Sequence, residues 1–568
     1  NYLISTHKVS NSSSFLFIFL FLFFTEKLHS EDTLTIHPIS FDTPSPKGWV
    51  AQYEVELDFP QADKVWKKIL MIQTLKCDSS TKADKYNCGE WDYIWDAMLY
   101  VPVNDTVEAF KIGSFVTPYG KRLKMGGHKG WEWIYDLSDY APILSGKKVL
   151  HIGNNQELLD IKFQFIKGVP ARDPMTVKNI YPLGEYDGHY GYTYKYGEIS
   201  KNEVLKPLQI DLSPLASGFS IKSIISGHGH EGPNYCCEWI SKSHFFIIND
   251  SKEHSWKVWK DCGNNPIYPQ GGTWPYDRAG WCPGTRVDEE VFELTYLVNP
   301  GQTITFDYEI EKMSDNTEEN GIYRMSHQLF SFGPPNFKRN LELVDLINPS
   351  SKDSYSRINP TLGKARVIVK NIGGEDIRRI KFIYGLISGK KSIFRWRGDL
   401  KFLEKSIISL PLNDWYGLKD DKRFFIEAIT INGRKDEDYV DNKIISEVKV
   451  PQVLPESFVI KLKTNNYGRS RQNSYDISDY NGNSFYSGSD FLDSSNYDIL
   501  IQLENGLYRF VFYDSNEDGI DRLWWKEKDS VGISGELGFY DVEQNPLKLF
   551  PADFGQEIRM DFIIGPIP

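Results

Sequence analysis

Short stretches in which apolar and polar residues alternate recur along the 568-residue chain, and they restrict its fold more than any other feature. Examples are Tyr53–Leu57 and Ile161–Phe165, whose two-residue period is that of a β-strand with one buried face. Gly, Pro, Asn and Asp separate these stretches, as they do in turns between strands. No amphipathic helical pattern is evident. The sequence therefore predicts an all-β protein.

A chain of this length needs more than one hydrophobic core, and breaks in the pattern suggest where it divides. Gly333-Pro334-Pro335 has the composition of a linker, and Pro451–Pro455 marks a second break. The expected parts are a signal peptide over 1–30, two β-sandwich regions over 31–168 and 169–335, an immunoglobulin-like accessory module, similar to CARDB-like modules, over 336–450, and a C-terminal β domain over 451–568.

An apolar run near the amino end, Phe15–Phe24, has the length of a secretory signal core and is too short to span a membrane comfortably. No other run approaches membrane length. We therefore expect a secreted, periplasmic or cell-surface protein with no membrane span in its mature form. The even count of six cysteines indicates disulfides in such a compartment. The net charge of −12 argues against nucleic acid as a partner, because phosphate binding needs a basic surface.

The stretch Cys77–Asp92 places acidic and aromatic residues directly after a short loop between two cysteines. If it continued as an extended strand, Glu90 and Asp92 would share one face, and Trp91 and Trp95 would line the other. Acidic groups beside aromatic rings are typical of carbohydrate-handling sites. The alternative is a solvent-facing acidic edge next to a structural disulfide.

Three further motifs follow in the order Ser226–His230, Cys236–Trp239 and Trp274–Gly284. Together with the Glu-Trp-Asp motif, and in this spacing, they resemble the bacterial peptide-N-glycosidase F family, whose members remove N-linked glycans from asparagine. The resemblance extends from about Phe59 to about Phe332. It implies two adjacent eight-stranded jelly-roll sandwiches with the active site in the cleft between them.

The resemblance also implies the chemistry, which is hydrolysis of the glycosylasparagine amide bond. The glycan leaves as a glycosylamine and asparagine becomes aspartate. Asp92 matches the principal catalytic carboxylate of the family, and Glu238 matches a second carboxylate that positions water or substrate. Arg278 is the best cation for orienting the substrate or the developing charge, unless it only forms a structural pair with Asp277. Trp281 either stacks on a sugar ring or belongs to the core.

The remaining candidates complete the expected site. The predicted substrate-binding residues are Glu90, Trp91, Asn155, His228, His230, Trp239, Arg278 and Trp281. The expected substrates are N-glycosylated proteins or glycopeptides, and neither a cofactor nor a metal is expected.

By the same resemblance, Cys77 pairs with Cys88 and Cys262 pairs with Cys282. Cys236 and Cys237 are left over. Being adjacent, they either form a vicinal bridge or stay reduced, and the sequence does not decide between the two states.

Three positions depart from the family pattern. Asn155 aligns with a third acidic residue, Tyr93 stands where the prototype has Arg, and Gly89 stands where it has Asp. These positions are expected near the first two sugars of the glycan, so we expect an altered glycan preference or a reduced activity.

Two other classes of function remain open. A non-catalytic N-glycan-binding surface protein is consistent with the loss of an acid at Asn155. A copper-dependent monooxygenase of the same architecture would need several His ligands and a Met, of which the sequence offers only His228-Gly229-His230. Separately, the acidic loop Asp514–Asp521 starts like a calcium-binding loop, but Trp525 replaces its last ligand, and a simple turn is the alternative.

Overall fold

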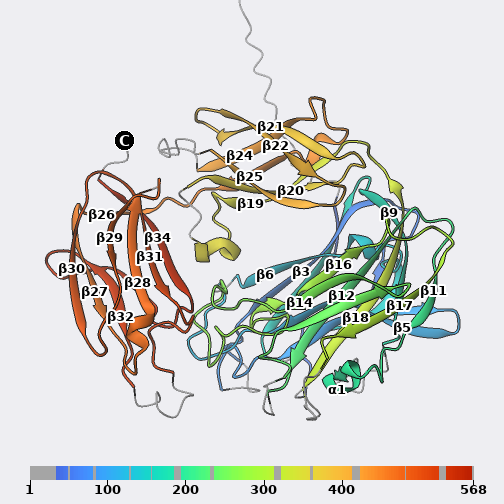
Figure 1. Ribbon diagram of the computed structural model, residues 1–568, viewed down its shortest axis with the longest axis horizontal. Coiled ribbons are helices and arrows are strands. Elements are labelled where there is room, and N and C mark those ends of the chain that lie inside the picture. The colour runs from blue at the N-terminus through green and yellow to red at the C-terminus, as the bar shows by residue number, and fades with distance from the viewer. Residues whose placement is uncertain are drawn as a thin grey trace, which may run out of the picture.

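The computed structural model describes residues 33–48, 51–80, 85–126, 129–154, 156–183, 193–230, 236–312, 321–358, 363–411, 422–479, 481–523 and 532–565. The expected signal segment 1–30, Asn155 and Trp525 lie outside these residues. The described chain is built almost entirely of antiparallel strands, which confirms the all-β prediction (Figure 1). No helix in these ranges is both long and apolar enough to cross a membrane.

The first sandwich is a jelly roll. One sheet has the order β1 (Thr33–Ile39), β8 (Leu158–Lys167), β3 (Trp66–Lys76), β6 (Trp131–Asp136). The other has the order β2 (Tyr53–Phe59), β7 (Gly146–Ile152), β4 (Ile94–Val103), β5 (Thr106–Val116). The orders 1-8-3-6 and 2-7-4-5 are those of an eight-stranded jelly roll made of two Greek keys.

The second sandwich repeats this order. Its sheets run β10 (Thr193–Lys195), β18 (Ile322–Pro335), β12 (Gly218–His228), β16 (Glu289–Glu293) and β11 (Leu208–Asp211), β17 (Thr303–Ile310), β13 (Lys242–Ile248), β14 (Ser251–Val258). An additional strand, β9 (Arg172–Asn179), also pairs with β18, and the short helix α1 (Tyr196–Ser200) follows β10. The short strand β15 (Thr285–Arg286) crosses over to pair with β5 of the first sandwich.

Two further sandwiches follow. The immunoglobulin-like module packs β19 (Leu341–Asn348), β20 (Ala365–Asn371), β23 (Lys405–Leu410) against β22 (Ser392–Leu400), β21 (Ile377–Leu386), β24 (Arg423–Ile431), β25 (Lys443–Glu447). The C-terminal sandwich packs β26 (Gln452–Leu454), β34 (Glu557–Ile564), β31 (Gly506–Asp514), β28 (Asn473–Asp479), β29 (Ser484–Gly488) against β30 (Asn496–Gln502), β27 (Ser457–Lys463), β32 (Glu536–Tyr540), β33 (Pro546–Phe550). The domain limits near 168, 335 and 450 stay predictions.

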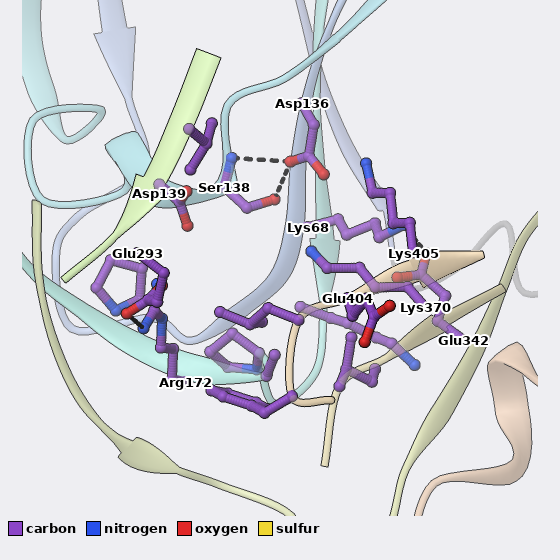
Figure 2. A pocket seen from close by; sticks show the side chains of 18 of the residues that line it. Lys68, Asp136, Ser138, Asp139, Arg172, Glu293, Glu342, Lys370, Glu404 and Lys405 are labelled. Carbon is purple, nitrogen blue, oxygen red and sulfur yellow. Dashed lines mark hydrogen bonds and ion pairs between the residues drawn. The ribbon is translucent and has the colours of Figure 1, made fainter. Parts of the chain in front are cut away.

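A cavity of about 620 Å³ lies where the immunoglobulin-like module meets both jelly rolls. Figure 2 shows that its walls are rich in charged side chains, among them Lys68, Lys370 and Lys405. Lys68 forms an ion pair with Glu342 of β19, and Arg172 forms a bidentate pair with Glu293. The Lys68–Glu342 pair thus links the first sandwich to the immunoglobulin-like module, whereas the Arg172–Glu293 pair lies within the second sandwich.

The two jelly rolls are joined by a buried ion cluster. The Asp96 carboxylate of β4 lies 3.3 Å from Lys111 Nζ on β5 and 2.5 Å from Arg324 Nη2 on β18. Burial alone would raise the pKa of Asp96, but Lys111 and Arg324 together hold it well below its ordinary value. Two cations from different sandwiches thus share one carboxylate, which fixes the relative position of the sheets on either side of the cleft.

Replacing Asp96 tests this junction. Asp96→Ala leaves Lys111 and Arg324 buried without their carboxylate, so we expect the free energy of unfolding to fall by about 3–5 kcal/mol. Urea denaturation followed by tryptophan fluorescence measures the change. Asp105→Ala, in the exposed turn between β4 and β5, is the matched control and should change stability by about 0.5 kcal/mol or less. An equal effect of the two variants would contradict the role of the cluster.

Candidate active site

The acidic motif lies in a turn and not in a strand. Strand β4 begins only at Ile94, so the predicted alternation of Glu90 and Asp92 along a strand is wrong. The physical reason is Gly89, whose positive φ of 84° turns the chain just after the Cys77–Cys88 disulfide. As a result Trp91 is 55% exposed, and the Glu90 carboxylate forms an ion pair with Lys85.

The position of Asp92 is fixed by the backbone on its C-terminal side. Tyr93 N–H donates to Thr117 Oγ1 at 2.9 Å, and Thr117 N–H donates to the Tyr93 carbonyl at 2.9 Å. The Asp92 carboxylate remains 23% exposed, and its Oδ2 lies 4.0 Å from Arg278 Nη2. Burial raises the pKa of Asp92, and the positive charge of Arg278 partly opposes this rise.

Glu238 comes from the second sandwich, on the loop that follows β12. Its backbone N–H donates to the Gly229 carbonyl at 3.0 Å, and its own carbonyl accepts from Ala279 N–H at 3.0 Å. The preceding Cys236 and Cys237 form a vicinal disulfide, which settles the alternative that the sequence left open. Burial raises the pKa of Glu238 to about 7, with a smaller contribution from the Asp92 charge, while Arg278 opposes the rise.

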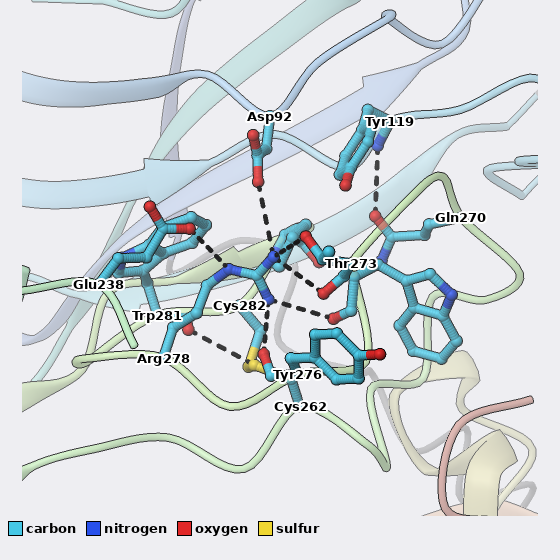
Figure 3. Close-up of polar contacts among 12 residues, drawn as sticks. Asp92, Tyr119, Glu238, Cys262, Gln270, Thr273, Tyr276, Arg278, Trp281 and Cys282 are labelled. Atoms are coloured by element: carbon cyan, nitrogen blue, oxygen red, sulfur yellow. Dashed lines mark hydrogen bonds and ion pairs between the residues drawn. A yellow bond between two sulfur atoms is a disulfide. The ribbon is translucent and has the colours of Figure 1, made fainter. Parts of the chain in front are cut away.

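Arg278 joins the two carboxylates (Figure 3). Its Nε lies 3.2 Å from Glu238 Oε1, and its side chain is 1% exposed. The other guanidinium N–H groups donate to the carbonyls of Thr273 (2.9 Å), Tyr276 (2.6 Å) and Trp274 (3.4 Å) and to the Thr273 hydroxyl (3.1 Å). With its donors directed inside the protein, Arg278 acts as a fixed positive charge between two acids.

The alternative pairing of Arg278 with Asp277 does not occur. The Asp277 carboxylate instead accepts from the backbone N–H of Cys262 at 2.9 Å. Cys262 is bonded to Cys282, as predicted, so this disulfide closes the loop that carries Arg278. A reciprocal pair of backbone hydrogen bonds between Lys260 and Arg278 holds the loop from the other side.

Two indole rings flank the guanidinium. Its central carbon lies 4.3 Å from the ring centre of Trp239 and 4.9 Å from that of Trp281. Trp281 is only 3% exposed, and its Nε1–H donates to the Gly227 carbonyl at 2.9 Å. This placement favours support of Arg278 over sugar stacking for Trp281, whereas the half-buried Trp239 remains a candidate for substrate contact.

The two histidines differ in their surroundings. His228 stacks on Trp281 with ring centres 5.3 Å apart, and its Nε2 lies 2.8 Å from Ser226 Oγ. Burial, with a further contribution from the Arg324 charge, lowers the pKa of His228 to about 3, so the ring is neutral at physiological pH. His230, just beyond the end of β12, is exposed. The substrate-binding roles assigned to both histidines stay predictions.

The structure adds residues that were not among the predicted site residues. A cavity of about 690 Å³ lies beside the motif and is lined by Trp91, Tyr119, Gln270 and Thr273, among others. The Tyr119 N–H donates to Gln270 Oε1 at 3.2 Å. Burial and the Asp92 charge raise the pKa of Tyr119, so its phenol keeps its proton. No sequence pattern points to Thr273, which holds Arg278 through its backbone carbonyl and its hydroxyl.

Two of the three departures from the family pattern lie in the described structure. Gly89 faces the side chains of Gln156 and Glu157, which would lie 3.2 and 3.5 Å from a Cβ built at this position. Both side chains are buried. A side chain at 89 would therefore press on the Gln156 amide and touch the Glu157 carboxylate, so these positions form one connected region. Tyr93 contributes its backbone to the site, as described for Asp92.

The described residues contain no group of three or more His, Cys, Asp or Glu side chains placed to hold a metal ion. His228 directs its Nε2 to the Ser226 hydroxyl. The copper-dependent alternative therefore lacks a donor set within the described ranges. In the acidic loop, Asp518 pairs with Arg469 and Asp521 pairs with Arg122, which favours the turn interpretation over a calcium site.

Comparison with known families agrees with this geometry. The family described as "Peptide-N-glycosidase F, C terminal" matches residues 195–330, which contain Glu238 and Arg278. The two-sandwich part of the chain is therefore similar to the peptide-N-glycosidase F family. A curated relative, peptide-N(4)-(N-acetyl-beta-D-glucosaminyl)asparagine amidase F of Elizabethkingia miricola, is 28% identical over 277 residues, covering 45% of this chain and 73% of the relative.

Solved structures of the same family were also found. The crystal structure of a peptide-N(4)-(N-acetyl-beta-D-glucosaminyl) asparagine amidase is 24% identical, with a TM-score of 0.44, and the match covers 54% of this chain and 98% of that one. The structure of PNGase F, a glycosylasparaginase from Flavobacterium meningosepticum, is 26% identical, with a TM-score of 0.43, and the match covers 53% of this chain and 96% of that one.

The raised pKa of Glu238 predicts a specific dependence of stability on pH. Folding raises this pKa from 4.5 to about 7, so the native state binds more protons than the unfolded state in this window. Stability is therefore lost as pH rises through it. Glu238→Gln keeps an acceptor for Arg278 without the charge. We expect its advantage over the parent to grow from about pH 4.5 to about pH 7 and to reach the order of 1–3 kcal/mol.

The measurement is urea denaturation of both proteins at about pH 5 and about pH 8. Glu90→Gln serves as the control, since Glu90 is an acid of the same motif that pairs with Lys85. If the free energies of unfolding of the parent and of Glu238→Gln changed equally with pH, the folded protein would not disfavour the Glu238 charge, and the prediction would be wrong.

Proposed function

We propose that the chain is an N-glycan amidase, a hydrolase that cleaves the amide bond between an asparagine side chain and the first N-acetylglucosamine. The glycan would leave as a glycosylamine, and the asparagine would become aspartate. One observation carries the proposal. Asp92 of the first sandwich and Glu238 of the second meet at a single buried guanidinium, and Trp91, next to Asp92, lines a cavity of about 690 Å³. Similarity of the two-sandwich part to peptide-N-glycosidase F supports the same reaction class.

The electrostatics of the pair suit acyl transfer to water. One cation faces two carboxylates, so the pair carries excess negative charge, and burial raises the pKa of both. A group whose pKa lies near the working pH can take and return a proton efficiently. Glu238, with a pKa of about 7, can therefore exchange a proton with the water or substrate that it positions. We assign the main proton-transfer role to Asp92, because it matches the principal catalytic carboxylate of the family and burial raises its pKa as well.

Arg278 is assigned a positioning role. Its N–H groups are directed to protein acceptors, so it does not bind the substrate directly. Its charge keeps the two acids at the site and limits the rise of both pKa values. We assign the protonated phenol of Tyr119, which lines the cavity, as the neutral donor to the developing oxyanion.

The expected substrates are N-glycosylated proteins or glycopeptides, and we propose that they are met outside the cytoplasm. The described cysteines form three disulfides, which are stable in oxidising compartments. The other candidate function is a non-catalytic N-glycan-binding protein. It is favoured by Asn155, which stands where the family has an acid.

Replacement of each carboxylate tests the proposal. The chain is incubated with a denatured N-glycoprotein, and the product is analysed by mass spectrometry. We expect loss of the glycan and conversion of the linkage asparagine to aspartate. Asp92→Asn should slow this reaction by about 10²- to 10⁴-fold, because general acid–base assistance contributes that much, and Glu238→Ala should also be severely impaired.

Asp105→Asn, in the exposed turn between β4 and β5, serves as the control and should keep the parental rate. Unchanged substrate mass together with retained affinity for the glycan would instead support the non-catalytic glycan-binding function. Full activity of Asp92→Asn would refute the assignment of this carboxylate.

A further inference from the structure

The C-terminal sandwich docks beside the candidate active site. Arg122 of the first sandwich places Nη1 2.6 Å from Asp521 Oδ2 and Nη2 2.8 Å from Asp553 Oδ2. The second sandwich adds Trp274, whose Nε1–H donates to Asp553 Oδ1 at 2.8 Å. The carbonyl of this same Trp274 accepts from Arg278, so the docking contacts reach the segment that holds the catalytic pair.

A second set of contacts fixes this docking. Arg357, in the 3-10 turn η3 (Asp353–Ile358) of the immunoglobulin-like module, donates through Nη2 to the carbonyls of Gly263 and Phe554. Its guanidinium lies 4.1 Å from the ring centre of Tyr268. Gln556 N–H also donates to the Gly263 carbonyl at 2.9 Å. Figure 1 shows η3 between the jelly rolls and the C-terminal sandwich. The C-terminal sandwich is therefore held by residues from three other parts of the chain.

The acidic loop Asp514–Asp521 is held in place by the contacts of its carboxylates. Asp518 forms an ion pair with Arg469 at 2.8 Å. Asp521 Oδ1 accepts from the Ser534 hydroxyl at 2.5 Å and from Arg522 N–H at 2.9 Å, while its Oδ2 binds Arg122. These contacts hold the backbone at Arg522, whose side chain is exposed and lines the cavity of about 690 Å³.

This cavity has walls from three sandwiches. Both jelly rolls contribute, and the C-terminal sandwich supplies Asp521, Arg522 and Ser534. Its volume lies within the range of about 300–1,000 Å³ found for small-ligand sites. On the first jelly roll it contains the exposed indole of Trp91, whose neighbour in the chain is Asp92. A ligand that fills the cavity would thus contact Trp91, the chain neighbour of Asp92, and the C-terminal sandwich.

We propose that the C-terminal sandwich completes the glycan-binding site, with Arg522 bonding to hydroxyl groups of an N-glycan sugar whose ring stacks on Trp91. The inference rests on the proposed function, since that function brings an oligosaccharide to Asp92. The cavity chemistry agrees with a saccharide. An exposed indole accepts the apolar face of a sugar ring, and a guanidinium and an amide such as that of Gln270 supply hydrogen bonds to hydroxyl groups.

The C-terminal sandwich lies beyond the region between Phe59 and Phe332 whose motifs resemble the amidase family. Its contribution would therefore be specific to chains with this extension. It would select the glycan through residues that are not needed for the bond cleavage itself. In this arrangement Arg522 determines affinity and specificity, while Asp92 and Glu238 determine the rate.

The test measures binding without turnover. The full chain carrying Asp92→Asn is titrated by calorimetry with a high-mannose N-glycopeptide, with the free oligosaccharide, and with the same peptide lacking the sugar. We expect Arg522→Ala, added to this chain, to weaken binding of the glycopeptide and of the free oligosaccharide by about tenfold, the loss expected for a hydrogen bond to a charged group. The affinity of Arg522→Lys should lie between those of the Asp92→Asn chain and of its Arg522→Ala variant, because lysine keeps the charge but lacks the planar guanidinium.

Lys548→Ala, on exposed β33 of the same sandwich, is the matched control and should leave every affinity unchanged. Oligosaccharide binding by Arg522→Ala within about twofold of the Asp92→Asn chain would overturn the inference, as would an equal loss with the sugar-free peptide, which would assign the cavity to polypeptide. The amidase proposal is tested separately. If the parent chain releases no glycan while Arg522→Ala still weakens oligosaccharide binding, only the amidase proposal fails.

Discussion

The arrangement of the site depends on one buried positive charge. Removing a guanidinium from water costs several kcal/mol unless its donors are bonded, and Arg278 meets this requirement with backbone carbonyls, a carboxylate and two indole faces. Because those carbonyls belong to Thr273, Tyr276 and Trp274, the loop must keep its shape for Arg278 to stay buried. The Cys262–Cys282 disulfide closes this loop, so the position of the charge, and with it the position of both acids, follows from the local fold.

The same physics gives opposite results at two places along the seam between the jelly rolls. At Asp96, one carboxylate faces Lys111 and Arg324, and their charges hold its pKa well below the ordinary value despite burial. At the candidate active site, two carboxylates share Arg278, and burial raises the pKa of both. The ratio of cations to carboxylates therefore separates a structural junction, whose acid stays ionised, from the candidate catalytic pair, in which the raised pKa values favour the protonated forms.

The strands were predictable from sequence because period-two alternation encodes them locally. The Asp92 and Glu238 pair and the Cys77–Cys88 and Cys262–Cys282 bridges are not local, and they were predicted from the resemblance to a known family. The prediction that Glu90 and Asp92 share a strand face was wrong, because alternation cannot reveal a turn at a glycine with positive φ. The contribution of Thr273 was missed for another reason. It holds Arg278 partly through a carbonyl, and every residue type has one.

The docking of the C-terminal sandwich against the jelly rolls could not be predicted from the sequence pattern. Packing between domains depends on their shapes and on a few charges that are scattered along the chain. Asp553 shows why it matters for the chemistry. Burial raises its pKa to about 7, while Arg122 and the Trp274 indole N–H favour its charged form. Trp274 also provides a carbonyl to Arg278. A contact that docks the last domain is thus two hydrogen bonds away from Arg278, so the extension and the candidate active site form one connected structure.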